Sequence, residues 1–134
     1  MVGGIVYLWV VDGRIKRETA LHAFISSLVA WVFAHIVKGF IPASRPFEIN
    51  GRAPLTFTFP DSGSFPSGHS AFVFAMAIAV FLHNKRLGIV YLILAMLVGL
   101  GRIFANVHFP VDILMGAILG AISAWVIKRI HLRT

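Results

Sequence analysis

The chain has 134 residues, of which 58% are hydrophobic and only 13% are charged, and it contains no cysteine. Because soluble domains carry about 25% charged residues, this composition excludes an ordinary soluble domain and predicts a membrane protein, while the lack of cysteine excludes disulfides and thiolate metal sites. The formal net charge of +7 does not favour nucleic acid as a partner, since basic residues of membrane proteins mostly flank the spans.

The apolar segments predict an all-α fold. Residues 2–11 are apolar but too few to cross a bilayer, which takes about 20 residues, so we expect a partial span there. Four longer segments are expected to be full spans, namely residues 19–38, 67–83, 87–102 and 110–127. The longest loop, residues 39–65, is rich in Pro, Gly and polar residues. The sequence therefore predicts a polytopic transmembrane helix bundle with four full spans plus a short N-terminal partial span, forming one domain over residues 1–134.

Two of these spans carry a small residue at every fourth position. In lipid, such stripes let neighbouring helices approach closely, so they predict tight packing and carry no information about chemistry. The positions are Ala71, Ala75 and Ala79 in one span and Gly116, Gly120 and Ala124 in the other.

Basic residues are distributed unequally between the two sides of the predicted bundle. Because consecutive loops alternate sides, one side receives eight Lys or Arg residues: Arg14, Lys16, Arg17, Lys85, Arg86, Lys128, Arg129 and Arg133. The other side receives four: Lys38, Arg45, Arg52 and Arg102. The positive-inside rule therefore predicts that the first side is cytoplasmic and that the second faces outward from the plasma membrane.

Polar residues that are costly near a membrane gather on the predicted outward side. They come from the end of the first full span and the loop after it, from the start of the second span, and from the connection before the last span. They are Lys38 and Arg45; Ser67, Gly68 and His69; and Arg102, His108 and Asp112. Helices of alternating direction bring these clusters to one membrane face, where they can converge.

The stretch from Phe65 to Ser70 is a compact polar turn directly before an apolar run. Proline is tolerated in the first turn of a helix, and free backbone N–H groups at a helix start bind anions. We therefore expect Pro66 in the first helical turn, free N–H groups on Ser67 and Gly68, and His69 placed to exchange a proton with a bound anion.

The chemistry suited to these residues is that of a charged oxyanion. Lys38, Arg45 and Arg102 provide three cations for it, and two histidines suit a nucleophile and a general acid. Asp112 lies one helical turn after His108 and can fix the imidazole tautomer. A two-metal phosphatase site needs several hard ligands, whereas Asp112 is the single carboxylate in this set, so we expect a reaction without metal or other cofactor.

Three ordered motifs carry a family resemblance. They are Lys38-x6-Arg45-Pro46, then Pro66-Ser67-Gly68-His69, then Arg102-x5-His108-x3-Asp112. Together they resemble the signature of the type-2 phosphatidate phosphatase superfamily, which comprises integral-membrane lipid phosphatases, acid phosphatases and haloperoxidases. The resemblance covers about residues 38–120, and within the family the chain is most similar to the undecaprenyl pyrophosphate phosphatases.

The resemblance implies a phosphohistidine mechanism. His108 would attack phosphorus, Asp112 would orient it, and His69 would protonate the leaving group. The remaining motif residues would hold the phosphoryl oxygens: Lys38, Arg45, Ser67, Gly68 and Arg102. The implied partners are a lipid phosphate or pyrophosphate substrate and the membrane, and an oligomer is possible.

The chain departs from the family pattern in two ways. Gly101 stands where the third motif usually has Ser, and the chain lacks the first span and most of the second of the usual six. These departures leave open the alternative of an inactive truncated relative that binds phospholipid. For the active enzyme, the alternative substrates are those of a phosphatidate or phosphatidylglycerophosphate phosphatase. A haloperoxidase shares the signature but is soluble, so the apolar spans argue against it.

Other polar and aromatic residues receive simpler interpretations. His22, His83 and His131 are expected at the cytoplasmic interface, while His35 lies one turn before Lys38 and is expected to serve packing or hydrogen bonding. Residues of the long loop are candidates for headgroup recognition or solvation (Glu48, Asn50, Arg52 and Asp61) and for tail guidance or interfacial anchoring (Phe47, Phe57, Phe59 and Phe65).

Overall fold

The structure is a computed structural model that describes residues 1–4, 14–57 and 59–131. These ranges contain helices and no strand, which confirms the all-α prediction for the described part of the chain. The helices are α2 (Arg14–Phe40), α3 (Pro46–Asn50), α4 (Gly68–His83), α5 (Lys85–Phe104) and α6 (Pro110–His131). The predicted partial span over residues 2–11 lies, from residue 5 onward, outside the described residues.

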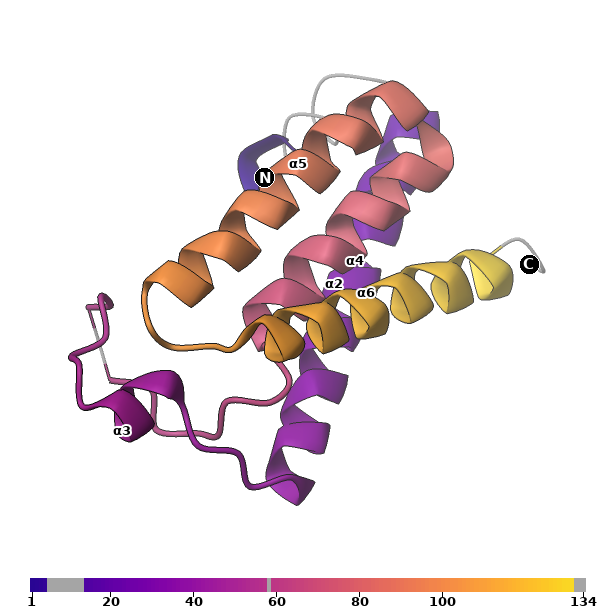
Figure 1. Cartoon of the computed structure of the whole chain (residues 1–134). Helices are drawn as coiled ribbons and strands as arrows, with labels where there is room; N and C mark the ends of the chain where they lie inside the picture. The colour runs from indigo at the N-terminus through magenta and orange to yellow at the C-terminus, as the bar shows by residue number, and fades with distance from the viewer. Residues whose placement is uncertain (5–13, 58, 132–134) are drawn as a thin grey trace.

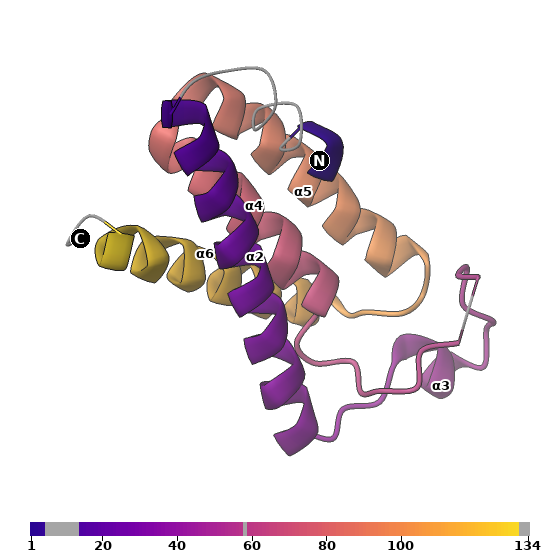
Figure 2. The ribbon, with the colours of Figure 1, turned by 180° about the vertical axis from the view of Figure 1, so that it is seen from behind.

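Helix α4 lies in the middle of the bundle. It packs against α2, α5 and α6, and α2 also packs against α6. Seen from opposite sides, α5 lies on one side of α4, with α2 and α6 on the other (Figures 1 and 2). The small-residue stripe of α4 is fully buried at Ala71, Ala75 and Ala79.

Two glycines allow α6 to approach α4 closely. A Cβ added to Gly116 would lie 2.6 Å from the Ser67 carbonyl oxygen, and one added to Gly120 would lie 2.6 Å from the Ala75 nitrogen. Real side chains essentially never approach backbone that closely, so alanine at either position would push the helices apart. The predicted tight packing of the small-residue stripes is thus confirmed.

Three helices in the described ranges are long and apolar enough to cross a membrane: Arg17–Phe40, Lys85–Phe104 and Pro110–His131. Helix α4 is apolar but has only 16 residues, which at 1.5 Å per residue is about 24 Å and falls short of a hydrocarbon core of about 30 Å. Three of the four predicted full spans therefore meet the criterion, and a count of four is not confirmed.

A single residue separates α4 from α5. The Asn84 N–H donates to the Val80 carbonyl (2.8 Å) and closes α4, while its side-chain oxygen accepts from the Leu87 N–H (3.1 Å) and caps α5. Lys85 and Arg86 consequently belong to the first turn of α5 and not to a separate turn, so the helix begins two residues before the predicted start.

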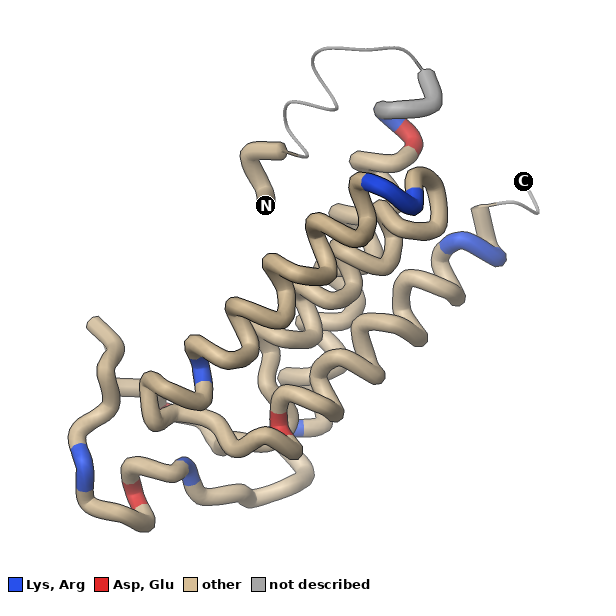
Figure 3. Tube along the Cα trace, turned by 45° about the horizontal axis from the view of Figure 1, so that its top comes forward, with Lys and Arg blue, Asp and Glu red and all other residues tan. Residues whose placement is uncertain are grey.

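Charged residues avoid the middle of the bundle. Figure 3 shows Lys and Arg near the helix ends and in the long loop that carries α3. At the end formed by the start of α2 and the end of α6, His22 is only 4% exposed and is therefore buried between helices. Its Nδ1 lies 2.8 Å from Nε2 of His83 and its Nε2 lies 2.8 Å from the Ala124 carbonyl oxygen, so it joins three helices.

Candidate active site

The other end of the bundle contains a cavity of about 570 Å³. The end of α2, the start of α4, the end of α5 and the long loop surround it. Six of the predicted site residues line its wall: Lys38, Arg45, Gly68, His69, Arg102 and His108. The structure therefore brings the three sequence clusters together, as the alternation of helix direction predicts. None of the lining residues that the structure describes is Asp or Glu.

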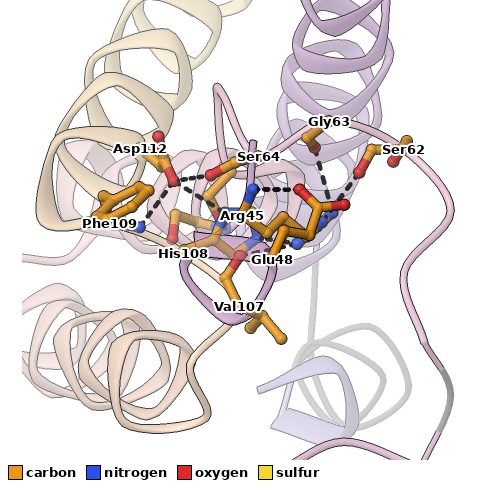
Figure 4. Close-up of polar contacts among 11 residues, drawn as sticks. Arg45, Glu48, Ser62, Gly63, Ser64, Val107, His108, Phe109 and Asp112 are labelled. Carbon is orange, nitrogen blue, oxygen red and sulfur yellow. Dashed lines mark hydrogen bonds and ion pairs between the residues drawn. The ribbon is translucent and has the colours of Figure 1, made fainter. Parts of the chain in front are cut away.

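Arg45 is held rigidly at the edge of this cavity. Its Nε donates to the Ser62 carbonyl (2.9 Å), its Nη1 to the Val107 carbonyl (2.9 Å) and its Nη2 to the Gly63 carbonyl (3.2 Å), as Figure 4 shows. The side chain is only 3% exposed. A guanidinium has five N–H donors, so these bonds fix its position and still leave donors for an anion.

The short helix α3 holds the backbone of Arg45. The Arg45 N–H donates to Oε2 of Glu48 (2.6 Å), and Pro46 occupies the first helical position, where its missing N–H costs nothing. Glu48, a candidate for headgroup recognition, is therefore engaged in capping this helix.

His108 lies between Arg45 and Asp112. Its Nε2 is 3.4 Å from Nη1 of Arg45, and its Nδ1 is 3.4 Å from Oδ2 of Asp112 (Figure 4). Because a guanidinium only donates and a carboxylate only accepts, this geometry assigns the hydrogen to Nδ1 and the lone pair to Nε2. The nitrogen with the lone pair belongs to a residue of the cavity wall, as a nucleophile requires.

Asp112 is buried behind His108, with 2% of its surface exposed. Its Oδ2 also accepts from the Phe109 N–H (2.8 Å) and from the Ser64 hydroxyl. Ser64 is fully buried, and its own N–H donates to the Ala43 carbonyl (2.9 Å). Ser64 was not among the predicted site residues, although it lies three residues before Ser67 in the motif loop.

The surroundings of His108 favour its neutral form. Burial, followed by the positive charges of Arg45 and Arg102, lowers the pKa of His108 from 6.5 to about 4, and the charge of Asp112 offsets only part of this shift. The imidazole is therefore unprotonated at neutral pH. Burial, followed by the charge of Arg102, also lowers the pKa of Arg45, although a guanidinium keeps its charge at any ordinary pH.

The turn before α4 differs from its prediction. The helix begins at Gly68 with Ser67 as its N-cap, so Pro66 precedes the first turn. The Ser67 N–H, expected to be free for an anion, donates to the Asp112 carbonyl (3.0 Å), and the Ser67 hydroxyl accepts from the Ser70 N–H (3.3 Å). Ser67 is fully buried and does not line the cavity, whereas Gly68 and His69 do.

Lys38 and Arg102 complete the positive wall at the ends of α2 and α5, and both are half-buried. Nε of Arg102 is buried without a hydrogen-bond partner among the described residues. An unpaired buried donor is costly, so this guanidinium is arranged for an acceptor that enters the cavity.

A pair of asparagines fastens the long loop next to His108. Asn50 Nδ2 donates to Asn106 Oδ1 (2.8 Å), and Asn106 Nδ2 donates back to Asn50 Oδ1 (3.1 Å) and to the Arg52 carbonyl (2.8 Å). Asn106 has φ of 64°, a left-handed conformation that asparagine tolerates better than most residues. The pair joins the loop that carries Arg45 to the connection that carries His108.

Several cavity residues had no assigned role in the sequence analysis. Trp31, Leu55, Thr56, Pro60 and Ser62 line the wall, together with His35 and Phe57, which had been given packing or tail-contact roles. Asp61 and Glu48 instead line a separate cavity of about 310 Å³. Gly101 does not line the main cavity, and a Cβ built there meets no described atom within 4 Å beyond its chain neighbours and the nearby backbone of α5, so its departure from the usual Ser leaves open space.

With this geometry in place, comparison with known proteins identifies the family. The model of the PAP2 superfamily matches residues 19–134, so the chain belongs to that superfamily. The family prediction is therefore confirmed.

Individual relatives cover most of this chain. It is 31% identical over 121 residues to the bacitracin transport permease protein BcrC of Bacillus licheniformis, covering 90% of this chain and 60% of that protein. It is 27% identical over 122 residues to the undecaprenyl-diphosphatase BcrC of Bacillus subtilis, covering 91% and 63%. The chain thus spans about three fifths of the length of these relatives.

The fold is also similar to a solved structure. The crystal structure of Aquifex aeolicus LpxE superposes with a TM-score of 0.72 over 95% of this chain and 74% of that protein, at 24% identity.

Proposed function

We propose that the protein is an integral-membrane lipid phosphatase that hydrolyses a phosphate or pyrophosphate monoester through a phosphohistidine. The observation that carries this proposal is the cavity whose wall combines His108, unprotonated at Nε2, with the three cations Lys38, Arg45 and Arg102, while Asp112 lies at Nδ1 of the His108 ring. This arrangement supplies a nucleophile and charge stabilisation for a phosphoryl group.

In the first step, Nε2 of His108 attacks phosphorus, and the bond from phosphorus to the leaving oxygen breaks. His69, in the first turn of α4 and on the cavity wall, donates a proton to that oxygen. As the P–N bond forms, His108 becomes positively charged, and the Asp112 carboxylate stabilises this charge through Nδ1–H.

In the second step, water attacks the phosphohistidine. His69, now unprotonated, accepts a proton from the water, the P–N bond breaks, and phosphate leaves with His108 restored. Each histidine thus returns to its starting protonation state after one turnover.

The two arginines are prepared for an anion in different ways. Arg45 is anchored by three carbonyls, and Arg102 has an unpaired Nε, so both can bind equatorial phosphoryl oxygens with little reorganisation. Lys38 adds a third charge. The donor set favours a reaction without metal, because Asp112 is turned toward His108, Phe109 and Ser64 and does not line the cavity.

An activity assay tests the reaction class. Purified protein in detergent with EDTA is expected to release phosphate from a prenyl pyrophosphate, and His108→Ala is expected to abolish release. Wild-type protein should also carry an acid-labile, alkali-stable phosphoryl label that the variant lacks. Activity surviving in His108→Ala would overturn the assigned nucleophile, and a strict need for a divalent ion would overturn the metal-free mechanism.

The proposed substrate is undecaprenyl pyrophosphate, which is supported by the names of the relatives and by the aromatic and apolar loop residues Leu55 and Phe57 at the cavity. A panel of undecaprenyl pyrophosphate, phosphatidate and phosphatidylglycerophosphate, compared by kcat/KM, tests this assignment. Higher kcat/KM on either of the other lipids would replace it.

The proposed location of the cavity is the outward face of the plasma membrane. The count of four basic residues on the cavity side against eight on the other supports this orientation. Because the chain has no cysteine, a single cysteine can report the side. A membrane-impermeant maleimide is expected to label Asp61→Cys but not Arg86→Cys in intact cells, and the reverse pattern would invert the orientation.

A further inference from the structure

His35 lines the cavity and has a ring nitrogen with no assigned role. The side chain is exposed, lines the cavity and stacks on Trp31 with ring centroids 4.0 Å apart. Its Nδ1 lies 2.9 Å from the Trp31 carbonyl oxygen, and because a carbonyl only accepts, Nδ1 carries a hydrogen. Nε2 has no hydrogen-bond partner within the ranges that the structure describes.

The position of His35 is set by its contact with the start of α4. A Cβ added to Gly68 would lie 3.0 Å from Cε1 of His35 and 3.6 Å from Cδ1 of Trp31. The missing side chain of Gly68 therefore gives room for the imidazole directly beside the turn that carries His69.

His35 and His69 lie on the same side of the cavity. Gly68, whose missing side chain leaves room for His35, directly precedes His69 in the first turn of α4. The ring nitrogens of His108 instead contact Arg45 and Asp112. His35 is thus placed on the His69 side, where the leaving group of the proposed reaction departs.

We propose that His35 is a specificity residue that binds the second phosphate of a diphosphate substrate. In a monophosphate ester the leaving group is an alcohol, which offers little for a charged donor. In a diphosphate the leaving group is itself a phosphate, and an imidazole protonated at Nε2 can donate to it while Nδ1–H remains on the Trp31 carbonyl. This proposal rests on the proposed function, since it assigns the leaving-group side from the roles of His108 and His69.

The variant His35→Asn tests this role selectively. The asparagine amide can replace Nδ1–H at the Trp31 carbonyl but has no counterpart of Nε2, so the helix contact is retained. We expect kcat/KM for farnesyl diphosphate to fall about tenfold or more, as for loss of a charged hydrogen bond, while kcat/KM for phosphatidate changes less than about twofold. His35→Gln, which places an amide nitrogen near Nε2, should recover part of the loss.

His131→Asn, an exposed histidine at the opposite end, is the matched control and should leave both substrates unaffected. Equal losses on both substrates would assign His35 a general structural or catalytic role, and no loss on the diphosphate would exclude it as a ligand. Either result overturns the proposal.

A binding measurement keeps this test separate from the proposed function. If wild-type protein hydrolyses neither substrate, the phosphatase proposal fails. The role of His35 can still be tested by titration calorimetry, which measures the dissociation constants of methylenediphosphonate and orthophosphate. We expect wild-type protein to prefer the diphosphonate and His35→Asn to lose that preference. An unchanged ratio of the two dissociation constants would overturn the role of His35.

Discussion

At one end of the bundle, both ring nitrogens of His22 are occupied by His83 and the Ala124 carbonyl, and Lys128 donates to the Leu82 carbonyl (2.9 Å). At the other end, His69 and His108 line a cavity, and Nε2 of His108 has one hydrogen-bond partner among the described residues, Nη1 of Arg45 at 3.4 Å. The two ends use the same residue types. A buried histidine whose two ring nitrogens are both hydrogen-bonded within the protein stabilises the bundle, whereas a histidine on the wall of a cavity is available for chemistry.

Among the variants that test the difference between the two ends, Asp112→Asn is expected to have the largest effect on kcat. An amide can present its N–H to Nδ1 and so favour the tautomer that has no lone pair at Nε2, which lowers kcat by roughly 10³-fold or more. Phosphate release by the purified variant, with its melting temperature compared with wild type, measures this effect. A loss below about tenfold would show that Asp112 does not set the tautomer.

Arg45→Lys is expected to lower kcat/KM by roughly 10²-fold, because a single ammonium cannot bond to the Ser62, Val107 and Gly63 carbonyls and an anion together. Lys128→Arg, at the other end, is the matched exchange and should keep activity within about twofold. Comparable activity of the two variants would mean that Arg45 acts only as a point charge.

The pH profile tests the free nitrogen directly. With a pKa of about 4, His108 stays about 90% unprotonated at pH 5, so the acid limb of kcat/KM due to this residue lies below pH 5. After allowance for the measured ionisation of the substrate, a limb near pH 6.5 would contradict this environment. Because the unfolded imidazole takes up a proton first as pH falls below about 6.5, stability should also decrease between pH 6.5 and 4.

His22→Ala is expected to change stability more than catalysis. Loss of its two bonds leaves the Ala124 carbonyl and His83 without their partner, which costs about 1–3 kcal/mol of unfolding free energy. The kcat of the folded fraction should stay within about twofold. A much larger loss of kcat at unchanged melting temperature would connect the far end of the bundle to the chemistry.

Gly101→Ser is expected to have the smallest effect. The position has open space, and replacing a helical glycine stabilises a helix by a few tenths of a kcal/mol, so activity should stay within about threefold of wild type. A large gain in kcat/KM would show that the usual hydroxyl reaches the substrate and that the Gly101 departure limits the enzyme.

The helices and most of the cavity could be predicted from the sequence, because the length of apolar segments and the order of the motifs do not depend on how the helices pack in detail. Lys38, Arg45, His69, Arg102 and His108 converge for that reason. Contacts that depend on loop conformation were not predictable. The Ser64 hydroxyl donates to the Asp112 carboxylate, and the Ser67 N–H donates to the Asp112 carbonyl. Both contacts depend on the close approach of α6 to α4 at Gly116. The bonds of His22 were likewise not predictable, because its partners lie 61 and 102 residues away in the sequence.

The shortness of α4 has a consequence for how a lipid reaches the cavity. A helix of about 24 Å cannot reach both surfaces of a hydrocarbon layer of about 30 Å, so at least one of its ends lies below the headgroup level unless the bilayer thins around it. If the recessed end is the one that carries His69, a phosphate must descend beneath its neighbours to reach the site. The charges of Lys38, Arg45 and Arg102 would then offset the loss of hydration of the phosphate. In that case the turnover rate depends on the thickness of the bilayer.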